Sequence, residues 1–268
     1  APSPEQGLLM MSAERADVII DFGAVPGVVN GMHIRIFNTA PDSPFGGFPA
    51  GLVGYVPADP GTSGQVMEFV VNTALPAQPT DTTSSLPQNL VLPAPAAIGA
   101  PTKTRQVSLN ELVSDQVCVE VDAISGAIVG TLFSTFAGDP NFLTNCATAV
   151  PTIPGNTAEP MGPRKALLGT VTTSGGNLVA FPQKWSDNAI TENPLLNATE
   201  TWEIYNTTAD AHPIHLHLVA FQVVNREDLD PAQLLLGNLV PNGTIFLPQP
   251  NELGHKDTVV TLPGQVTR

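Results

Sequence analysis

Proline and glycine interrupt this sequence too often for long helices to form. The 268 residues include 27 prolines and 23 glycines, which separate short apolar runs and do not form repeats. Proline removes a backbone donor and glycine favours turns, so this spacing is typical of a chain with many short strands. We therefore predict an all-β fold. The frequent Val, Ile, Leu and Phe runs argue against a disordered proline-rich chain.

The charge balance argues against two classes of partner. The chain has 24 acidic and 10 basic residues and a net charge of −14. Binding to nucleic acid or to an anionic membrane surface needs clustered Lys and Arg. No apolar run approaches the roughly 18 residues of a membrane helix. We expect neither nucleic acid nor membrane as a partner.

Two β-rich regions with a proline-rich linker between them are predicted. Residues 76–104 combine many prolines with Thr and Ser and show little periodicity, which indicates an extended linker. The remaining predictions are a strand pair over 8–22, a long loop over 134–165 and a short helix at Leu229–Leu236. Strands are expected at His33–Asn38, Val66–Val71, Arg105–Asn110, Leu167–Val171, Leu178–Phe181, Thr201–Asn206, His215–Val224 and Thr258–Leu262.

The two cysteines, Cys118 and Cys146, are far apart and lie outside any metal-binding or redox motif. Two interpretations stay open: a pair of buried free thiols, or a disulfide around a long loop. If they are oxidised, we expect them to pair with each other. A disulfide would indicate an exported protein.

Three of the five histidines fall in the segment His212-Pro213-Ile214-His215-Leu216-His217. Side chains alternate along a strand, so His215 and His217 are expected on one face. His212 precedes proline, which favours an extended or turn conformation and directs its ring elsewhere. Neutral imidazole binds copper, zinc, iron or nickel, so His212, His215 and His217 are candidate metal ligands. A zinc hydrolase is a weaker alternative, because its usual HExxH helix is absent.

Three segments resemble the three-domain multicopper oxidases, in particular the bacterial branch with spore-coat laccase, bilirubin oxidase and phenoxazinone synthase. Glu200–Leu218 resembles that family's third cupredoxin domain, and residues 13–22 resemble a segment of its second domain. Gly254–Val259 resembles a GWKDT-like stretch, with His255 at the usual Trp position. The three landmarks follow the family's order along the chain.

The resemblance implies cupredoxin-like Greek-key β-sandwich domains, both incomplete or partly represented. Residues 1–75 would be the C-terminal part of a second domain, and 76–104 the linker. Residues 105–268 would form a third domain that lacks its C-terminal copper motif. The chain begins with Ala, not Met, so it is expected to be trimmed or incomplete.

The resemblance also assigns roles to the histidines. His212 would bind the type 1 copper, His215 the type 2 copper and His217 one type 3 copper. No catalytic residue beyond these metal ligands is implied. The complete enzyme would couple one-electron oxidation of a small phenolic, aromatic amine, tetrapyrrole or metal substrate to reduction of dioxygen to water. Such an enzyme is expected to be exported to the periplasm, the cell or spore surface, or the medium.

The chain departs from the family pattern in the ligands that it lacks. The HxH motifs that the family's first domain supplies and the final HCHxxxHxxxxM motif do not occur, and His33 and His255 do not match them. Neither Cys118 nor Cys146 has the neighbouring histidines of a blue-copper cysteine. We expect this chain alone to be inactive, with the remainder of the oxidase on the same or another chain. The alternative is a non-catalytic, cupredoxin-like structural or metal-binding β-sandwich protein.

Overall fold

Strands dominate the structure, a computed structural model, so the all-β prediction is confirmed. The residues that it describes are 7–20, 22, 25–41, 45–46, 56–74, 89, 91, 94–113, 115–136, 138–161, 164–185 and 190–268. The strands are β1 His33–Phe37, β2 Gln65–Val70, β3 Lys103–Val113, β4 Asp115–Val121, β5 Ile128–Phe136, β6 Thr157–Met161, β7 Arg164–Ser174, β8 Asn177–Pro182, β9 Glu200–Asn206, β10 His212–His215, β11 Arg226–Leu229, β12 Pro241–Phe246, β13 Thr258–Thr261 and β14 Gln265–Thr267. The helices are α1 Phe142–Ala147, α2 Pro231–Leu235, which lies in the predicted helical segment, and a 3-10 turn, Pro250–Glu252.

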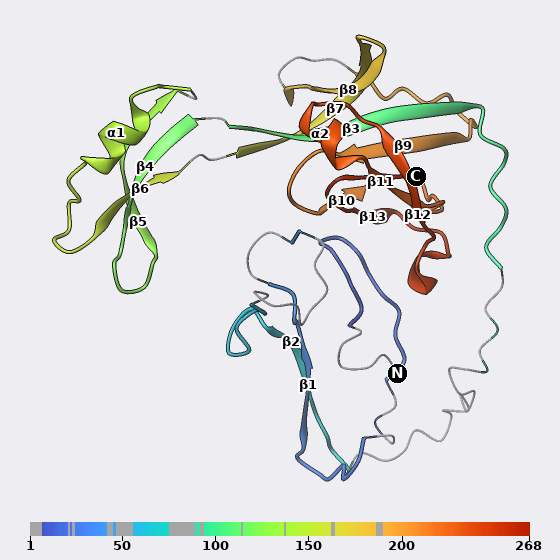
Figure 1. Cartoon of the computed structure of the whole chain (residues 1–268). Helices are drawn as coiled ribbons and strands as arrows, with labels where there is room; N and C mark the ends of the chain where they lie inside the picture. Colours follow the sequence, from blue (N-terminus) through green and yellow to red (C-terminus); the bar gives the residue numbers. More distant parts are fainter. Residues whose placement is uncertain are drawn as a thin grey trace.

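The main sheet has seven strands in the order β12-β11-β14-β9-β3-β7-β8 (Figure 1). Its pairs are antiparallel except β3 and β9, which run parallel from Lys103 opposite Glu200 to Leu109 opposite Asn206. This parallel pair joins segments almost a hundred residues apart. It places β9, which leads into the histidine segment, at the centre of the sheet.

A second layer covers one face of this sheet. Strands β10 and β13 pair antiparallel, from His212 opposite Thr261 to His215 opposite Thr258. Ile214 of β10 packs against the buried cluster of Val107, Leu109 and Ile204 on the main sheet. The apolar face of the sheet therefore fixes the position of β10, the strand on which two of the candidate ligands lie.

A small subdomain is inserted between β3 and β7 and projects from their ends (Figure 1). Its three strands lie in the order β5-β4-β6, and α1 packs on them. The expected loop over 134–165 is wrong here, because β4 supplies a pairing partner for β6 and α1 buries Phe142 and Cys146. Cys118 and Cys146 form a disulfide in its core, which confirms their expected pairing.

The region before residue 75 contains the predicted strands β1 and β2, paired only with each other. Ala58 is the one buried apolar side chain among its described residues. The predicted strand pair over 8–22 is wrong: residues 8–20 and 22 form no strand. Val18 and Ile19 are β-forming, but no described segment offers them a hydrogen-bonded neighbour. β-Branched side chains favour an extended backbone without supplying that partner.

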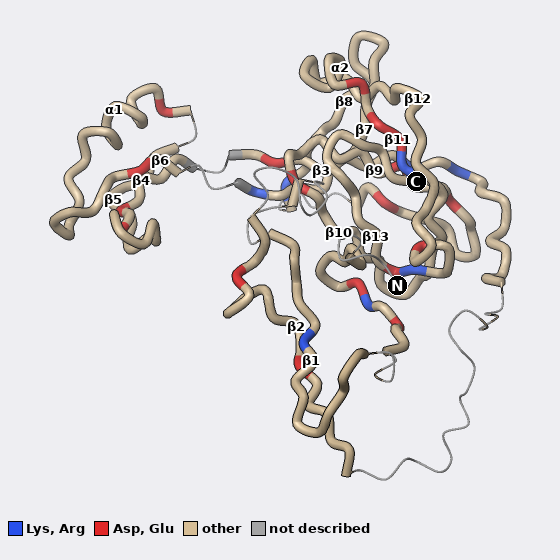
Figure 2. Tube along the Cα trace, turned by 60° about the horizontal axis from the view of Figure 1, so that its bottom comes forward, with Lys and Arg blue, Asp and Glu red and all other residues tan. Residues whose placement is uncertain are grey.

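The predicted linker is only partly described. Residues 76–88, 90 and 92–93 lie outside the described residues, and 94–102 form neither helix nor strand. Strand β3 begins at Lys103, within the expected linker range. Figure 2 shows the described Lys and Arg scattered along the chain. No described helix is long and apolar enough to span a membrane.

Candidate metal centre

The histidine segment begins as a strand and then turns away. Strand β10 ends at His215, and Leu218 adopts a positive φ of 68°. A branched side chain rarely adopts that conformation, so the backbone is bent there. The predicted strand over His215–Val224 is therefore wrong beyond its first residue. Phe221 regains one antiparallel bridge, to Lys256.

The His215 ring is held at its Nδ1 atom. This nitrogen lies 2.9 Å from the backbone oxygen of Asp257 and 2.8 Å from the Thr258 hydroxyl oxygen. A backbone carbonyl only accepts hydrogen bonds, so Nδ1 must carry the proton. In the neutral imidazole, Nε2 then has the free lone pair. A carbonyl that orients the far nitrogen in this way is typical of metal-binding histidines.

The His212 ring is held at the opposite nitrogen. Its Nε2 lies 2.7 Å from the hydroxyl oxygen of Thr208. That oxygen is also 2.8 Å from Asn206 Oδ1 and 3.0 Å from the Asp210 backbone oxygen, both acceptors. When the single hydroxyl proton goes to one of these oxygens, Nε2–H of His212 donates to Thr208. Nδ1 of His212 is then the nitrogen with a free lone pair.

His217 lies beside His215. Their ring centroids are 5.0 Å apart with the ring planes at 73°. Both residues are exposed, whereas His212 is half-buried. Ile214 and Leu216 line a cavity that neither His215 nor His217 lines. The alternation expected from the sequence therefore holds across this segment although the regular strand ends at His215.

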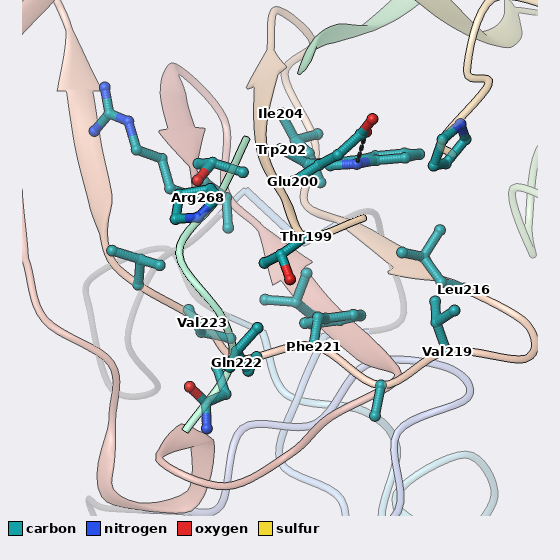
Figure 3. Close-up of a pocket in the computed structure, with 18 of the residues that line it drawn as sticks. Thr199, Glu200, Trp202, Ile204, Leu216, Val219, Phe221, Gln222, Val223 and Arg268 are labelled. Carbon is teal, nitrogen blue, oxygen red and sulfur yellow. Dashed lines mark hydrogen bonds between the residues drawn. The ribbon is translucent and has the colours of Figure 1, made fainter. Parts of the chain in front are cut away.

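The cavity behind the segment has a volume of about 640 Å³ and lies between the main sheet and residues 219–224. In Figure 3, Glu200, Trp202 and Ile204 form one wall, and Val219, Phe221 and Val223 form the other. The charged side chains in its lining are already paired, Glu200 with Arg105 and Arg268 with Glu203 and Glu227. The cavity therefore presents a mainly apolar surface behind the histidines.

The electrostatics near His215 are set by a carboxylate. The hydrogen bond from the Arg15 guanidinium lowers the pKa of the Asp257 carboxyl from 3.8 to about 2. Asp257 Oδ1 lies 3.9 Å from Nδ1 of His215. A negative charge therefore stands behind this imidazole, on the side away from its free Nε2.

The three candidate ligands lie at two separate positions, His212 at one and His215 with His217 at the other. The free nitrogens of His212 and His215 differ, and the two residues pair with opposite ends of β13. Within the described residues, no three His, Cys, Asp or Glu side chains converge on a point where a metal could bind. The described part of the chain thus offers parts of coordination sites, and a metal would need further ligands.

Sequence reasoning missed the residues that orient the rings: Thr208, Asp257 and Thr258. Asp257 and Thr258 stood in the Gly254–Val259 landmark, but only the β10–β13 register places them against His215. Thr208 lies four residues before His212, in a turn tied by Asn206, and no pattern marked it.

Comparison with known proteins places this segment in a family. The family model described as multicopper oxidase matches residues 160–268. A laccase from Bacillus subtilis (strain 168) is 39% identical over 103 residues, which are 38% of this chain and 20% of that protein. A laccase from Bacillus stratosphericus is 37% identical over 103 residues, again 38% and 20%. Multicopper oxidase LPR1 homolog 5 from Oryza sativa subsp. japonica is 25% identical over 242 residues, 90% of this chain and 27% of that protein.

Over residues 160–268, this chain matches the multicopper oxidase family. It spans about a fifth of the length of the two Bacillus laccases. The matched residues 160–268 include β7–β14 and all three candidate ligands, and exclude most of the inserted subdomain. The family implies copper, and imidazole nitrogens with free lone pairs are suitable copper donors. The oriented rings of His212 and His215, both within the matched residues, fit that metal.

Proposed function

We propose that this chain supplies three copper ligands to an oxidase. The oxidase would couple one-electron oxidation of a small phenolic, aromatic amine, tetrapyrrole or metal substrate to reduction of dioxygen to water. His212 would bind the type 1 copper, His215 the type 2 copper and His217 a type 3 copper. The remaining ligands would come from the rest of the oxidase, on the same or another chain.

One observation carries this proposal: His212 and His215 are held at opposite ring nitrogens. Thr208 holds Nε2 of His212, whereas the Asp257 carbonyl and Thr258 hold Nδ1 of His215. Two imidazoles directed by separate hydrogen-bond systems support two separate metal sites. Bound copper would supply the electron transfer, and these residues would fix the direction of each ligand.

Within the chain, the two kinds of site would have different tasks. His212, half-buried near Asn206 and Thr208, would serve the copper that accepts electrons from the reducing substrate. His215 and His217, exposed and 5.0 Å apart, would face the part of the oxidase that completes the dioxygen-reducing cluster. The short His215-Leu216-His217 spacing would keep the two cluster ligands at a fixed separation.

The disulfide adds two expectations. Both cysteines of the chain are oxidised in the Cys118–Cys146 bond, so neither is a thiolate that could bind type 1 copper. The blue copper–thiolate bond would therefore need a cysteine from elsewhere, and the isolated chain would be colourless and inactive. A structural disulfide also supports export to an oxidising compartment.

The histidine variants in the whole oxidase test the division of roles. His212→Ala should abolish the blue absorption and block substrate oxidation. His215→Ala or His217→Ala should keep the blue absorption and impair dioxygen reduction, with less copper bound. His33→Ala is the control, because His33 pairs with Glu68 on β1 and β2 and should leave copper content unchanged. Equal copper loss and equal spectra in all three test variants would refute the proposal.

A further inference from the structure

Three consecutive residues near the start of the chain contact three consecutive residues at the beginning of β13, of which Thr258 is the first residue of the strand. Arg15 donates two hydrogen bonds to the Asp257 carboxylate, at 2.7 and 2.6 Å. Lys256 forms an ion pair with Glu14 at 3.0 Å, and the Thr258 hydroxyl lies 3.2 Å from the Ala13 backbone oxygen. We call this arrangement of residues 13–15 and 256–258 the clasp. It joins positions more than 240 residues apart in the chain.

The first half of the clasp is a defined turn. Ala13 has a positive φ of 69°, and Glu14 and Met11 exchange two hydrogen bonds, one through the Glu14 carboxylate. Arg15 also donates to the backbone oxygen of Ala13 at 2.8 Å. The guanidinium is therefore fixed by the turn that carries it. A planar guanidinium held in this way binds a carboxylate through two parallel hydrogen bonds, one from each terminal nitrogen.

The second half of the clasp is the hydrogen-bonding partner of His215. The Asp257 backbone oxygen accepts from His215 Nδ1 and from the Leu216 amide, at 2.9 Å each. The Thr258 hydroxyl faces two acceptors, Ala13 O and Asp257 Oδ1, and can donate to only one. Its oxygen is then free to accept from His215 as well. Both groups that orient the imidazole thus belong to residues held by the 13–15 turn.

The exposure of the ion pair indicates what it contributes. Arg15 is 67% exposed and Asp257 33% exposed. Ion pairs at such exposed positions contribute little to folding stability. The geometry is nevertheless specific. Arg15 makes two hydrogen bonds to Asp257, and residues beside this pair also contact each other, Glu14 with Lys256 and Ala13 with Thr258. For the Arg15–Asp257 pair, this combination favours a role in orientation over a role in stability.

We propose that Arg15 and Asp257 are positioning residues for His215, and that the clasp fixes the direction in which its Nε2 presents a lone pair to copper. This inference rests on the proposed function, since it concerns the same candidate type 2 ligand. It adds that a residue far outside the histidine segment, and outside the matched 160–268 range, sets the geometry of that ligand.

The isolated chain offers a test that needs no copper. In the 268-residue chain with ¹⁵N-labelled histidine, at a pH where the rings are neutral, His215 should be a single tautomer protonated at Nδ1. Arg15→Met should give a mixture of His215 tautomers. Arg35→Met is the matched control, because Arg35 is an exposed arginine paired with Glu68 on β2 and has no contact with His215. Unchanged His215 resonances in folded Arg15→Met would overturn the inference.

The whole oxidase gives the second test. Arg15→Met should weaken copper binding at the type 2 site by about 10- to 100-fold, the usual effect of removing a residue that orients a ligand. The blue absorption and the melting temperature should change little. Should Arg15→Met fail to fold, Arg15→Asp combined with Asp257→Arg should restore the type 2 signal, and no restoration would count against the clasp. Wild-type copper binding in folded Arg15→Met would also overturn the inference.

The two proposals can fail separately. If His215→Ala keeps all its copper, the assignment of His215 is wrong and the clasp has no ligand to position. If His215→Ala loses type 2 copper while Arg15→Met and Asp257→Asn do not, the proposed function stands and the positioning role falls.

Discussion

Cys118 on β4 and Cys146 on α1 are joined by a disulfide, and both side chains are completely inaccessible to solvent. The inserted subdomain has few other buried side chains. Its apolar cluster has one further buried member, Phe142. A small core of this kind depends on a cross-link for stability. The disulfide and the burial around it therefore determine whether the insert keeps its fold.

The first prediction concerns this disulfide. Replacing both Cys118 and Cys146 by Ala should destabilise the insert by about 3–4 kcal/mol, because the cross-link restricts a loop of 28 residues in the unfolded chain. Amide hydrogen exchange should accelerate in β4–β6 and stay unchanged in β9 and β3. Equal protection of the insert in the double variant and the wild type would contradict this.

The second prediction concerns a buried carboxylate next to the disulfide. Glu120 accepts hydrogen bonds from Thr152, Ile153 and Asn156, and the bond from the Thr152 hydroxyl is the main cause that lowers its pKa from 4.5 to about 2. A carboxyl with a depressed pKa stabilises the fold above its ordinary pKa, and that contribution is lost as the pH falls from about 4.5 to about 2. The segment 150–157 should therefore lose exchange protection over this window.

Glu120→Gln should remove that pH dependence and expose the segment already at neutral pH. Glutamine has one acceptor oxygen, so its NH2 group would face either the Thr152 donors or the Ile153 and Asn156 donors. Glu159→Gln serves as the control, since Glu159 is an exposed residue of the neighbouring strand β6. A Glu120→Gln variant with the wild-type pH profile would show that this carboxylate does not anchor the loop.

Short strands were predictable from local pattern alone. The runs at Leu167–Val171, Leu178–Phe181 and Thr201–Asn206 all lie within observed strands. Residues 8–20 show the limit of such patterns, because extended backbone becomes a strand only when a neighbour pairs with it. The local sequence does not indicate which distant segment will pair with it. The same limit explains the missed strand β6, whose partner β4 lies about forty residues earlier.

The candidate site was also only partly predictable, because local pattern indicates the ligands but not the distant residues that orient them. The spacing of His212, His215 and His217 indicated that their side chains point in two directions. Alternation of side chains along an extended backbone was enough to derive this. The orienting atoms came from Thr208, from Asp257 and Thr258, and through the clasp from Arg15. Those contacts depend on the β10–β13 register and on a turn near the start of the chain, which no local pattern specifies.

The third prediction concerns Gly169, at the centre of β7. A Cβ atom there would lie 2.4 Å from the Phe181 backbone oxygen and 2.7 Å from Asn110 Nδ2. Gly169→Ala should therefore destabilise the sandwich by about 1–3 kcal/mol, the cost typical of overpacking. Gly130→Ala in β5 is the control, because a Cβ there meets nothing within 4 Å. Urea unfolding should separate the two, and similar midpoints would refute the steric argument.

The last prediction concerns Thr208, whose hydroxyl holds Nε2 of His212 at 2.7 Å. Thr208→Val keeps the shape of the side chain and removes the hydroxyl. The His212 ring would then lose the acceptor for its Nε2 proton, and Asn206 Oδ1 would keep only the Thr208 amide as donor in this turn. Nδ1 would no longer be fixed toward the proposed type 1 copper.

In the whole oxidase, Thr208→Val should shift or weaken the blue absorption and lower type 1 copper affinity by about 10- to 100-fold. Thr208→Ser retains the hydroxyl and should keep the wild-type spectrum. The type 2 signal should be the same in both variants, because His215 is held by Asp257 and Thr258 instead. A Thr208→Val variant with the wild-type blue spectrum would show that Thr208 does not orient His212. A simultaneous loss of type 2 copper would instead contradict the separation of the two sites across β10.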